Sequence, residues 1–114
     1  MPATVARLGS YDAVLADPSI DVVYLPLPTR THLEWVVKAA EAGKHVLVEK
    51  PVALNAEELR QMIHACHKAG VQLMDGLMFI HHDRFTKVRA VFDDALTWEP
   101  VRVSAAFTFQ ASTS

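Results

Sequence analysis

Short, unbroken hydrophobic runs alternate along the chain with longer segments in which hydrophobic positions recur every three or four residues. The run Val22–Leu25 has the length and β-branched content of a strand buried on both faces, which indicates a parallel sheet. His45–Val48 and Val71–Met74 predict two further strands. Strands and helical segments in regular succession, joined by loops of a few residues, are typical of right-handed βαβ crossovers in a doubly wound α/β fold.

Capping residues mark the ends of the predicted helices. Each of three helices has an N-terminal cap and a residue that ends it: Ser10 and Asp17, Thr31 and Gly43, and Asn55 and Gly70. Thr31 and Glu34 have the spacing of a capping box. In the second and third helices the spacing predicts these core-facing positions: Leu33, Val36, Val37, Ala40, Leu59, Met62, Ile63 and Cys66.

The pattern changes after Gly76. Phe85, Val88 and Phe92 predict one more helix, and residues 101–109 then alternate with a period of two. Alternation of this kind is typical of an antiparallel sheet with one buried and one solvated face. The end of the sequence therefore predicts the start of a second, α+β architecture with an antiparallel sheet.

Charge and composition exclude several classes of function. The 114 residues carry 11 basic and 13 acidic side chains, and Lys and Arg form no cluster. We therefore expect neither a nucleic acid nor a membrane as a partner. No hydrophobic run approaches the roughly 20 residues that a membrane helix requires. Cys66 is the single cysteine, which fits a reducing, cytoplasmic location.

Candidate chemistry lies where the predicted strands end, because ligands bind at the carboxyl ends of the strands in open α/β sheets. Lys50 follows an apolar strand, where partial burial favours the neutral amine and proton exchange with a substrate hydroxyl or carbonyl. The alternative is a surface lysine paired with Glu49 or another carboxylate. His32 adjoins another strand end, and its ring either meets a ligand or caps the turn.

The remaining histidines and the cysteine favour structural roles. The adjacent side chains of His81 and His82 point in different directions, and no third ligand has a suitable spacing, so we predict no metal site. His64 and His67 lie three residues apart and are expected on a solvated side of a helix. Cys66 falls on a hydrophobic stripe, which favours core packing over nucleophilic chemistry.

Longer strings of the chain resemble a known enzyme family. They are DVVYLPLPTRTHLEWVVKAAEAGKHVLVEKPVALNAEEL, GVQLMDGLMFIHHDR and VRVSAAFTF, within which AGKHVLVEKP is the most specific. From Gly9 onward the chain resembles the Gfo/Idh/MocA family of nicotinamide-dependent oxidoreductases, near its dihydrodiol-dehydrogenase-like members. The resemblance implies that residues 1–82 are part of an NAD(P)-binding Rossmann domain and that residues 83–114 begin a C-terminal substrate domain.

The resemblance also implies roles for residues at two strand ends. Lys50 matches the family's catalytic lysine, which moves a proton while the cofactor, NAD or NADP, moves the hydride. Glu49 matches the acidic residue near the nicotinamide ribose, and Pro51 matches a proline that often follows a cis peptide bond. The family's turn that borders the cofactor is matched by Leu27, Pro28, Thr29 and His32.

The chain departs from the family pattern in three places. Thr29 stands where the family usually has asparagine, and Ile80 stands where many relatives have arginine. The chain has four glycines and no GxGxxG, the Gly-rich turn whose backbone approaches the pyrophosphate. We therefore expect a fragment that is inactive by itself, whereas an intact relative is expected to form a homo-oligomer.

Two functions stay open. In the first, the chain is part of an oxidoreductase that transfers a hydride to or from a sugar, polyol or dihydrodiol, with Lys50 as proton donor or acceptor. In the second, the chain is a non-catalytic module that acts only in protein association or has no function. The family resemblance favours the first.

Overall fold

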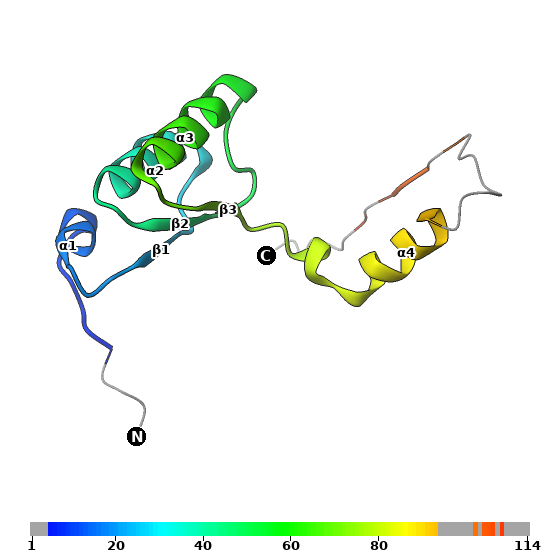
Figure 1. Cartoon of the computed structure of the whole chain (residues 1–114), viewed down its shortest axis with the longest axis horizontal. Helices are drawn as coiled ribbons and strands as arrows, with labels where there is room; N and C mark the ends of the chain where they lie inside the picture. The colour runs from blue at the N-terminus through cyan, green and yellow to red at the C-terminus, as the bar shows by residue number, and fades with distance from the viewer. Residues whose placement is uncertain (1–4, 94–101, 103, 107, 109–114) are drawn as a thin grey trace, which may run out of the picture. The chain divides into compact units, whose positions relative to one another are not determined.

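The structure, a computed structural model, describes residues 5–93, 102, 104–106 and 108 (Figure 1). Its elements are, in chain order, α1 (Tyr11–Ala16), β1 (Val22–Leu25), the 3₁₀ helix η1 (Thr29–Thr31), α2 (His32–Glu41), β2 (His45–Val48), α3 (Ala56–Ala69), β3 (Leu73–Asp75), the 3₁₀ helix η2 (Met78–His81) and α4 (Asp83–Asp93). The chain divides into two compact units, Met1–Leu77 and Met78–Ser114. Each unit is described by itself.

The three strands of the first unit form one parallel sheet in the order β1-β2-β3. Leu25 lies beside Val48, and Val48 lies beside Asp75, so the strands end at a common edge. Helices α2 and α3 pack against each other and lie together over one face of the sheet (Figure 1). The α/β fold with a parallel sheet is therefore confirmed.

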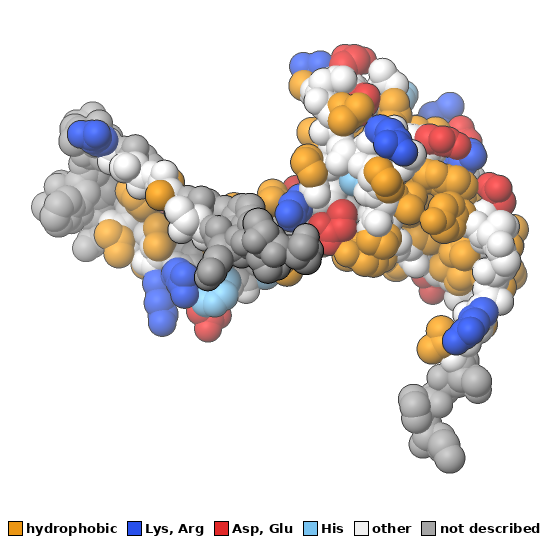
Figure 2. All heavy atoms as spheres, turned by 180° about the vertical axis from the view of Figure 1, so that it is seen from behind, with side chains coloured by type: hydrophobic (Ala, Val, Ile, Leu, Met, Phe, Trp, Pro, Cys, Tyr) orange, Lys and Arg blue, Asp and Glu red, His pale blue; other side chains and the backbone are white. Residues whose placement is uncertain are grey.

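The prediction that β1 is buried on both faces is wrong for the described part of the chain. Val23 and Leu25 are 6% and 9% exposed, whereas Val22 and Tyr24 are 58% and 53% exposed. Side chains alternate along a strand, and α2 and α3 cover one face, so every second residue stays at the surface. Figure 2 shows hydrophobic side chains at the surface of this unit. The buried core consists of Val23, Leu25, Val36, Ala39, Ala40, Val46, Val48, Met62, Cys66 and Val71.

Helix α2 begins without the predicted capping box. The Thr31 hydroxyl donates a hydrogen bond to the carbonyl oxygen of Pro28 (2.8 Å), because η1 leads directly into the helix. Glu34 instead accepts a hydrogen bond from Nζ of Lys38, one helical turn later (2.7 Å). The buried face of α2 is also rotated relative to the predicted one, so that Leu33 and Val37 are only half-buried. The buried residues of α2 are His32, Val36, Ala39 and Ala40.

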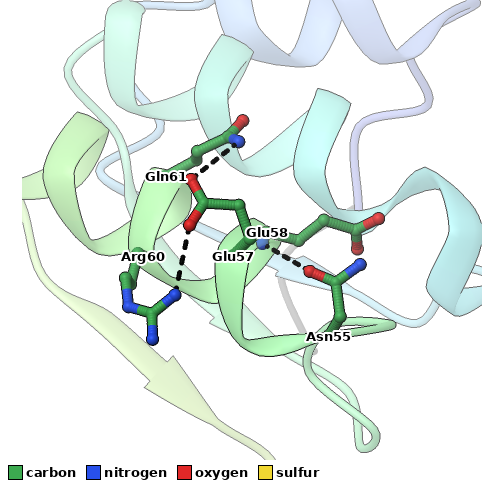
Figure 3. A network of polar contacts seen from close by, with 5 residues as sticks. All are labelled: Asn55, Glu57, Glu58, Arg60 and Gln61. Carbon is green, nitrogen blue, oxygen red and sulfur yellow. Dashed lines mark hydrogen bonds and ion pairs between the residues drawn. The ribbon is translucent and has the colours of Figure 1, made fainter.

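The other predicted caps are confirmed. The backbone amide of Ala13 donates to Oγ of Ser10 (3.1 Å), and the amide of Glu58 donates to Oδ1 of Asn55 (2.9 Å). Figure 3 shows the Asn55 cap beside the contacts of Glu57 with Arg60 and Gln61 on the first turns of α3. At the other end of α3, Gly70 has a φ of 70°, which suits a residue without Cβ.

Two predictions for α3 and the strand that follows it are wrong. Strand β3 begins at Leu73 rather than at Val71, because the Val71 amide donates to the carbonyl oxygen of Cys66 (3.0 Å) and completes the end of the helix. The Gln72 amide donates to Nδ1 of His45 (2.9 Å). Ile63, which was predicted to face the core, is 53% exposed.

The second unit contains η2 and α4, and the helix predicted from Phe85, Val88 and Phe92 is confirmed as α4. None of the residues of α4 is buried. Phe79 and Phe85 pack edge to face with ring centroids 6.1 Å apart. The predicted antiparallel strand over residues 101–109 falls largely outside the described residues, and the domain boundary at residue 82 stays a prediction.

Candidate functional site

The ends of β1, β2 and β3 form one edge of the sheet, and the residues that follow them lie close together. The amide of Glu49 donates to the carbonyl oxygen of Leu25 (3.2 Å), and the amide of Gly76 donates to that of Val48 (2.9 Å). These two backbone hydrogen bonds continue the pairing of β2 with β1 and of β3 with β2 by one residue beyond the strand ends. The candidate site is built on this edge, which we call the carboxyl edge and define by Leu25, Glu49 and Gly76.

The Glu49 carboxylate lies over the carboxyl edge. Its Oε1 accepts a hydrogen bond from the hydroxyl of Tyr24 (2.6 Å), and its Oε2 accepts one from the amide of Lys50 (3.1 Å). Gly76 lies on its other side, where an added Cβ would be 3.3 Å from Oε2. Side chain and backbone from the ends of all three strands therefore meet at one carboxylate.

These hydrogen bonds shift the pKa values of both partners. The Tyr24 hydroxyl, and after it the Lys50 amide, hold the pKa of the Glu49 carboxyl below its ordinary value of 4.5. Partial burial of the carboxyl opposes this effect, and the positive charge of Lys50 adds to it. Donation to Glu49 raises the pKa of the Tyr24 hydroxyl above 10.0. Near neutral pH the pair is therefore a carboxylate and a protonated phenol.

Lys50 is exposed, which corrects the prediction of partial burial. The reason is its position at a bend, two residues beyond the end of β2. The Lys50–Pro51 peptide bond is cis. Within residues 5–93, its Nζ makes no hydrogen bond or salt bridge. The alternative of an ion pair with Glu49 or another carboxylate is therefore not formed among these residues, and the side chain is exposed.

His32 is fully buried beneath the loops that follow β1 and β2. Its Nε2 lies 2.8 Å from the carbonyl oxygen of Leu27, and its Nδ1 lies 3.0 Å from that of Val52. Both ring nitrogens therefore face backbone of the protein. The imidazole joins the two loops that border the carboxyl edge.

The three predicted site residues in the turn after β1 differ from one another in their contacts. The Leu27 side chain is half-buried and packs against the hydrophobic core. The carbonyl oxygen of Pro28 accepts hydrogen bonds from both the amide and the hydroxyl of Thr31, at 2.9 and 2.8 Å. Thr29 is half-buried at the start of η1. Backbone contacts to Thr31 and His32 thus hold this turn beside the carboxyl edge.

The residues for which structural roles were predicted are either exposed or buried in the core. His64 and His67 are exposed on α3, as predicted, and Cys66 is 2% exposed in the core. Burial raises the pKa of the Cys66 thiol, which keeps it protonated. His82 is exposed, and its Nδ1 accepts a hydrogen bond from the amide of Arg84 (3.0 Å).

Neither a metal cluster nor a membrane span occurs in the part of the chain that the structure describes. No three His, Cys, Asp or Glu side chains gather there as metal ligands would. The helices among the same residues are too short or too polar to cross a bilayer.

Sequence reasoning did not single out two residues of the candidate site, Tyr24 and Gly76. Tyr24 was counted as one more apolar residue of a strand, although its position one residue before the strand end would bring its hydroxyl close to the carboxyl edge. Gly76 was placed within the third strand end, residues 75–82, but was not singled out there. Its position directly after β3 brings it beside Glu49.

Comparison with known proteins identifies the family. Residues 3–77 match the model of the oxidoreductase family with an NAD-binding Rossmann fold, Gfo/Idh/MocA. The chain is 36% identical over 103 residues to a dTDP-3,4-didehydro-2,6-dideoxy-alpha-D-glucose 3-reductase of Streptomyces violaceoruber, which is 90% of this chain and 30% of that reductase. It is 49% identical over 74 residues to D-xylose 1-dehydrogenase (NADP(+)) 2 of Haloferax volcanii, which is 65% of this chain and 23% of that enzyme.

A solved structure has the same fold. KijD10, a 3-ketoreductase from Actinomadura kijaniata in complex with NADP and TDP-benzene, superposes with a TM-score of 0.72 and 35% identity. The match covers 78% of this chain and 27% of KijD10. The chain thus spans less than a third of the length of these relatives. By the family match over residues 3–77, the chain belongs to the Gfo/Idh/MocA family of oxidoreductases, whose matched domain is an NAD-binding Rossmann fold.

Proposed function

We propose that the chain forms the nicotinamide-side part of an NAD(P)-dependent oxidoreductase that acts on a hydroxyl or carbonyl group of a sugar or sugar derivative. The observation that carries the proposal is the arrangement at the carboxyl edge, where an exposed amine, an ionised carboxylate and a glycine lie at the ends of neighbouring parallel strands. Relatives named as a sugar-nucleotide 3-reductase and a xylose dehydrogenase support the substrate class.

The residues of the carboxyl edge fit a nicotinamide ribose. The Glu49 carboxylate accepts only two hydrogen bonds from the described residues, and a carboxylate has about four acceptor positions, so it can accept ribose hydroxyls as well. Gly76 leaves free the space that a Cβ would fill beside Glu49. A bound nicotinamide supplies or accepts the hydride.

The chain's own residues then have distinct roles. Nζ of Lys50 donates a proton to the substrate oxygen when a carbonyl is reduced, and accepts it when an alcohol is oxidised. Glu49 binds and orients the ribose. The turn of Leu27, Pro28 and Thr29 borders the cofactor, and His32 holds that turn from beneath rather than by touching the cofactor with its buried ring.

The test places this chain in a reductase of known activity. The matching segment of the Actinomadura 3-ketoreductase is replaced by the described first unit, and NADPH-dependent reduction is measured in the chimera. We expect Lys50→Ala to lower kcat by roughly 10²- to 10⁴-fold, the usual contribution of an acid–base group, and to change NADPH affinity by less than about threefold.

The control is Lys68→Ala, which removes another exposed lysine, on α3. This variant is expected to have the same kcat and the same NADPH affinity as the unaltered chimera. Equal losses of turnover and cofactor affinity in Lys50→Ala would show that the lysine has a structural role, and an unchanged kcat would contradict the proposal.

A further inference from the structure

Tyr24 is the one side-chain donor to Glu49 among the described residues, and nothing in the family comparison assigns it a role. Its hydroxyl reaches from β1, across the end of the sheet, to the Glu49 carboxylate that follows β2 (2.6 Å). An O–H···O⁻ bond of this length is in the range of strong, charge-assisted hydrogen bonds. Tyr24 is 53% exposed on the uncovered face, so burial does not explain the tyrosine.

The contacts of Glu49 show what Tyr24 contributes. A glutamate side chain has three rotatable bonds, and the Lys50 amide alone restrains one oxygen, Oε2. The Tyr24 hydroxyl restrains the other oxygen, Oε1. With both oxygens restrained, the free acceptor positions of the carboxylate keep fixed directions.

We propose that Tyr24 is a positioning residue that fixes the Glu49 carboxylate as a receptor for the vicinal hydroxyls of the nicotinamide ribose. This inference rests on the proposed function, since it assigns a further residue to the same site. Two restrained oxygens suit a vicinal diol, whose two hydroxyls donate in parallel to one carboxylate. Preorganisation of this kind improves affinity, because the side chain loses less freedom when the ligand binds.

The experiment uses the whole chain and a ligand that contains only the proposed half of the cofactor. Nicotinamide mononucleotide is titrated into the isotopically labelled protein and its Kd is obtained from chemical-shift changes, while the pKa of Glu49 is followed through its carboxyl carbon. The variants are Tyr24→Phe, Glu49→Gln and the double variant. Tyr11→Phe is the matched control, because Tyr11 is the chain's other tyrosine and its ring packs on Trp35.

Three results are expected if Tyr24 positions Glu49. Tyr24→Phe binds nicotinamide mononucleotide roughly fivefold more weakly, the effect of one lost hydrogen bond, while Tyr11→Phe binds as the unaltered chain does. The pKa of Glu49 rises in Tyr24→Phe and is unchanged in Tyr11→Phe. The double variant binds as weakly as Glu49→Gln and no more weakly, because both changes act through one carboxylate.

The outcomes separate this inference from the function on which it rests. Unchanged affinity in Tyr24→Phe, together with weakened binding in Glu49→Gln, overturns the role of Tyr24 and leaves the proposed function standing. Unchanged affinity in Glu49→Gln, or no saturable binding by the unaltered chain, overturns the ribose site and the inference together.

Discussion

At the scale of single residues, His32 links two loops through one ring. The carbonyl oxygens of Leu27 and Val52 only accept hydrogen bonds, and each lies within 3.0 Å of a ring nitrogen. The ring is fully buried, so a side chain without N–H groups would leave these carbonyls without this partner. The geometry of the turn after β1 therefore depends on a residue whose side chain never reaches the surface.

We expect His32→Leu to lower the free energy of unfolding by about 2 kcal/mol, because the leucine side chain cannot donate a hydrogen bond to either carbonyl oxygen. His32→Gln keeps an amide N–H of similar reach and is expected to lose about half as much. Urea unfolding followed by circular dichroism measures both. Equal stability of the three proteins would show that the ring acts by filling space and not by hydrogen bonding.

Gly76 acts at the same scale on the other side of Glu49. An added Cβ would lie 3.3 Å from Oε2 of Glu49 and 3.4 Å from the carbonyl oxygen of Val48. Because the carboxylate ends a flexible side chain, it moves more easily than the backbone. We expect Gly76→Ala to displace it from Tyr24 and to raise the pKa of Glu49 back toward 4.5.

Carboxyl-carbon chemical shifts of Glu49, followed through an acid titration, measure this effect. Gly9→Ala is the matched control, since a Cβ at that position meets no atom within 4 Å. A Glu49 titration in Gly76→Ala that matches that of Gly9→Ala would contradict the close contact.

At the scale of elements, some features follow from the local sequence, whereas others depend on tertiary contacts. The helix caps at Ser10 and Asn55 involve residues three apart, so the sequence alone was sufficient to predict them. The start of β3 was not predictable in this way, because the Val71 amide has a helical carbonyl as its partner. Exposure of Tyr24 also depends on which face the helices cover, a property of the whole sheet.

The same limit applies to the candidate site. Lys50 and Glu49 were predicted from a contiguous motif that resembles a family motif, whereas their neighbours come from distant parts of the chain. Tyr24 lies 25 residues before Glu49, and Val52 lies 20 residues after His32. Such pairs follow from strand order and register, and no pattern within one segment encodes them.

The cap of α3 permits a test at the element scale. Asn55→Ala removes the acceptor of the Glu58 amide, and we expect it to lower the free energy of unfolding by about 1 kcal/mol. Asn55→Asp keeps an acceptor at this position and is expected to stay within a few tenths of a kcal/mol, roughly, of the unaltered chain. Thermal or urea unfolding distinguishes the two variants. If Asn55→Asp lowered the free energy of unfolding as much as Asn55→Ala, the result would argue against capping.

At the scale of the whole molecule, the two units differ in how much they bury. The first unit holds the buried core between α2, α3 and the sheet, with Val48 and Met62 fully inaccessible. In the second unit, α4 has no buried residue, and Val91 is 62% exposed. Helical hydrogen bonds that are not supported by a buried face open easily, because most helical stability comes from packing.

Amide hydrogen exchange of the whole chain therefore should separate the units. We expect the amides of β2 to exchange roughly a hundredfold or more slowly than those of α4, since β2 opens only when the core opens. Val46 and Val48, 2% and 0% exposed, report on the first unit, and Val88 and Val91 report on the second. Exchange in α4 as slow as in β2 would mean that a further contact protects this helix, and the stripe of Phe85, Val88 and Phe92 would then be its site.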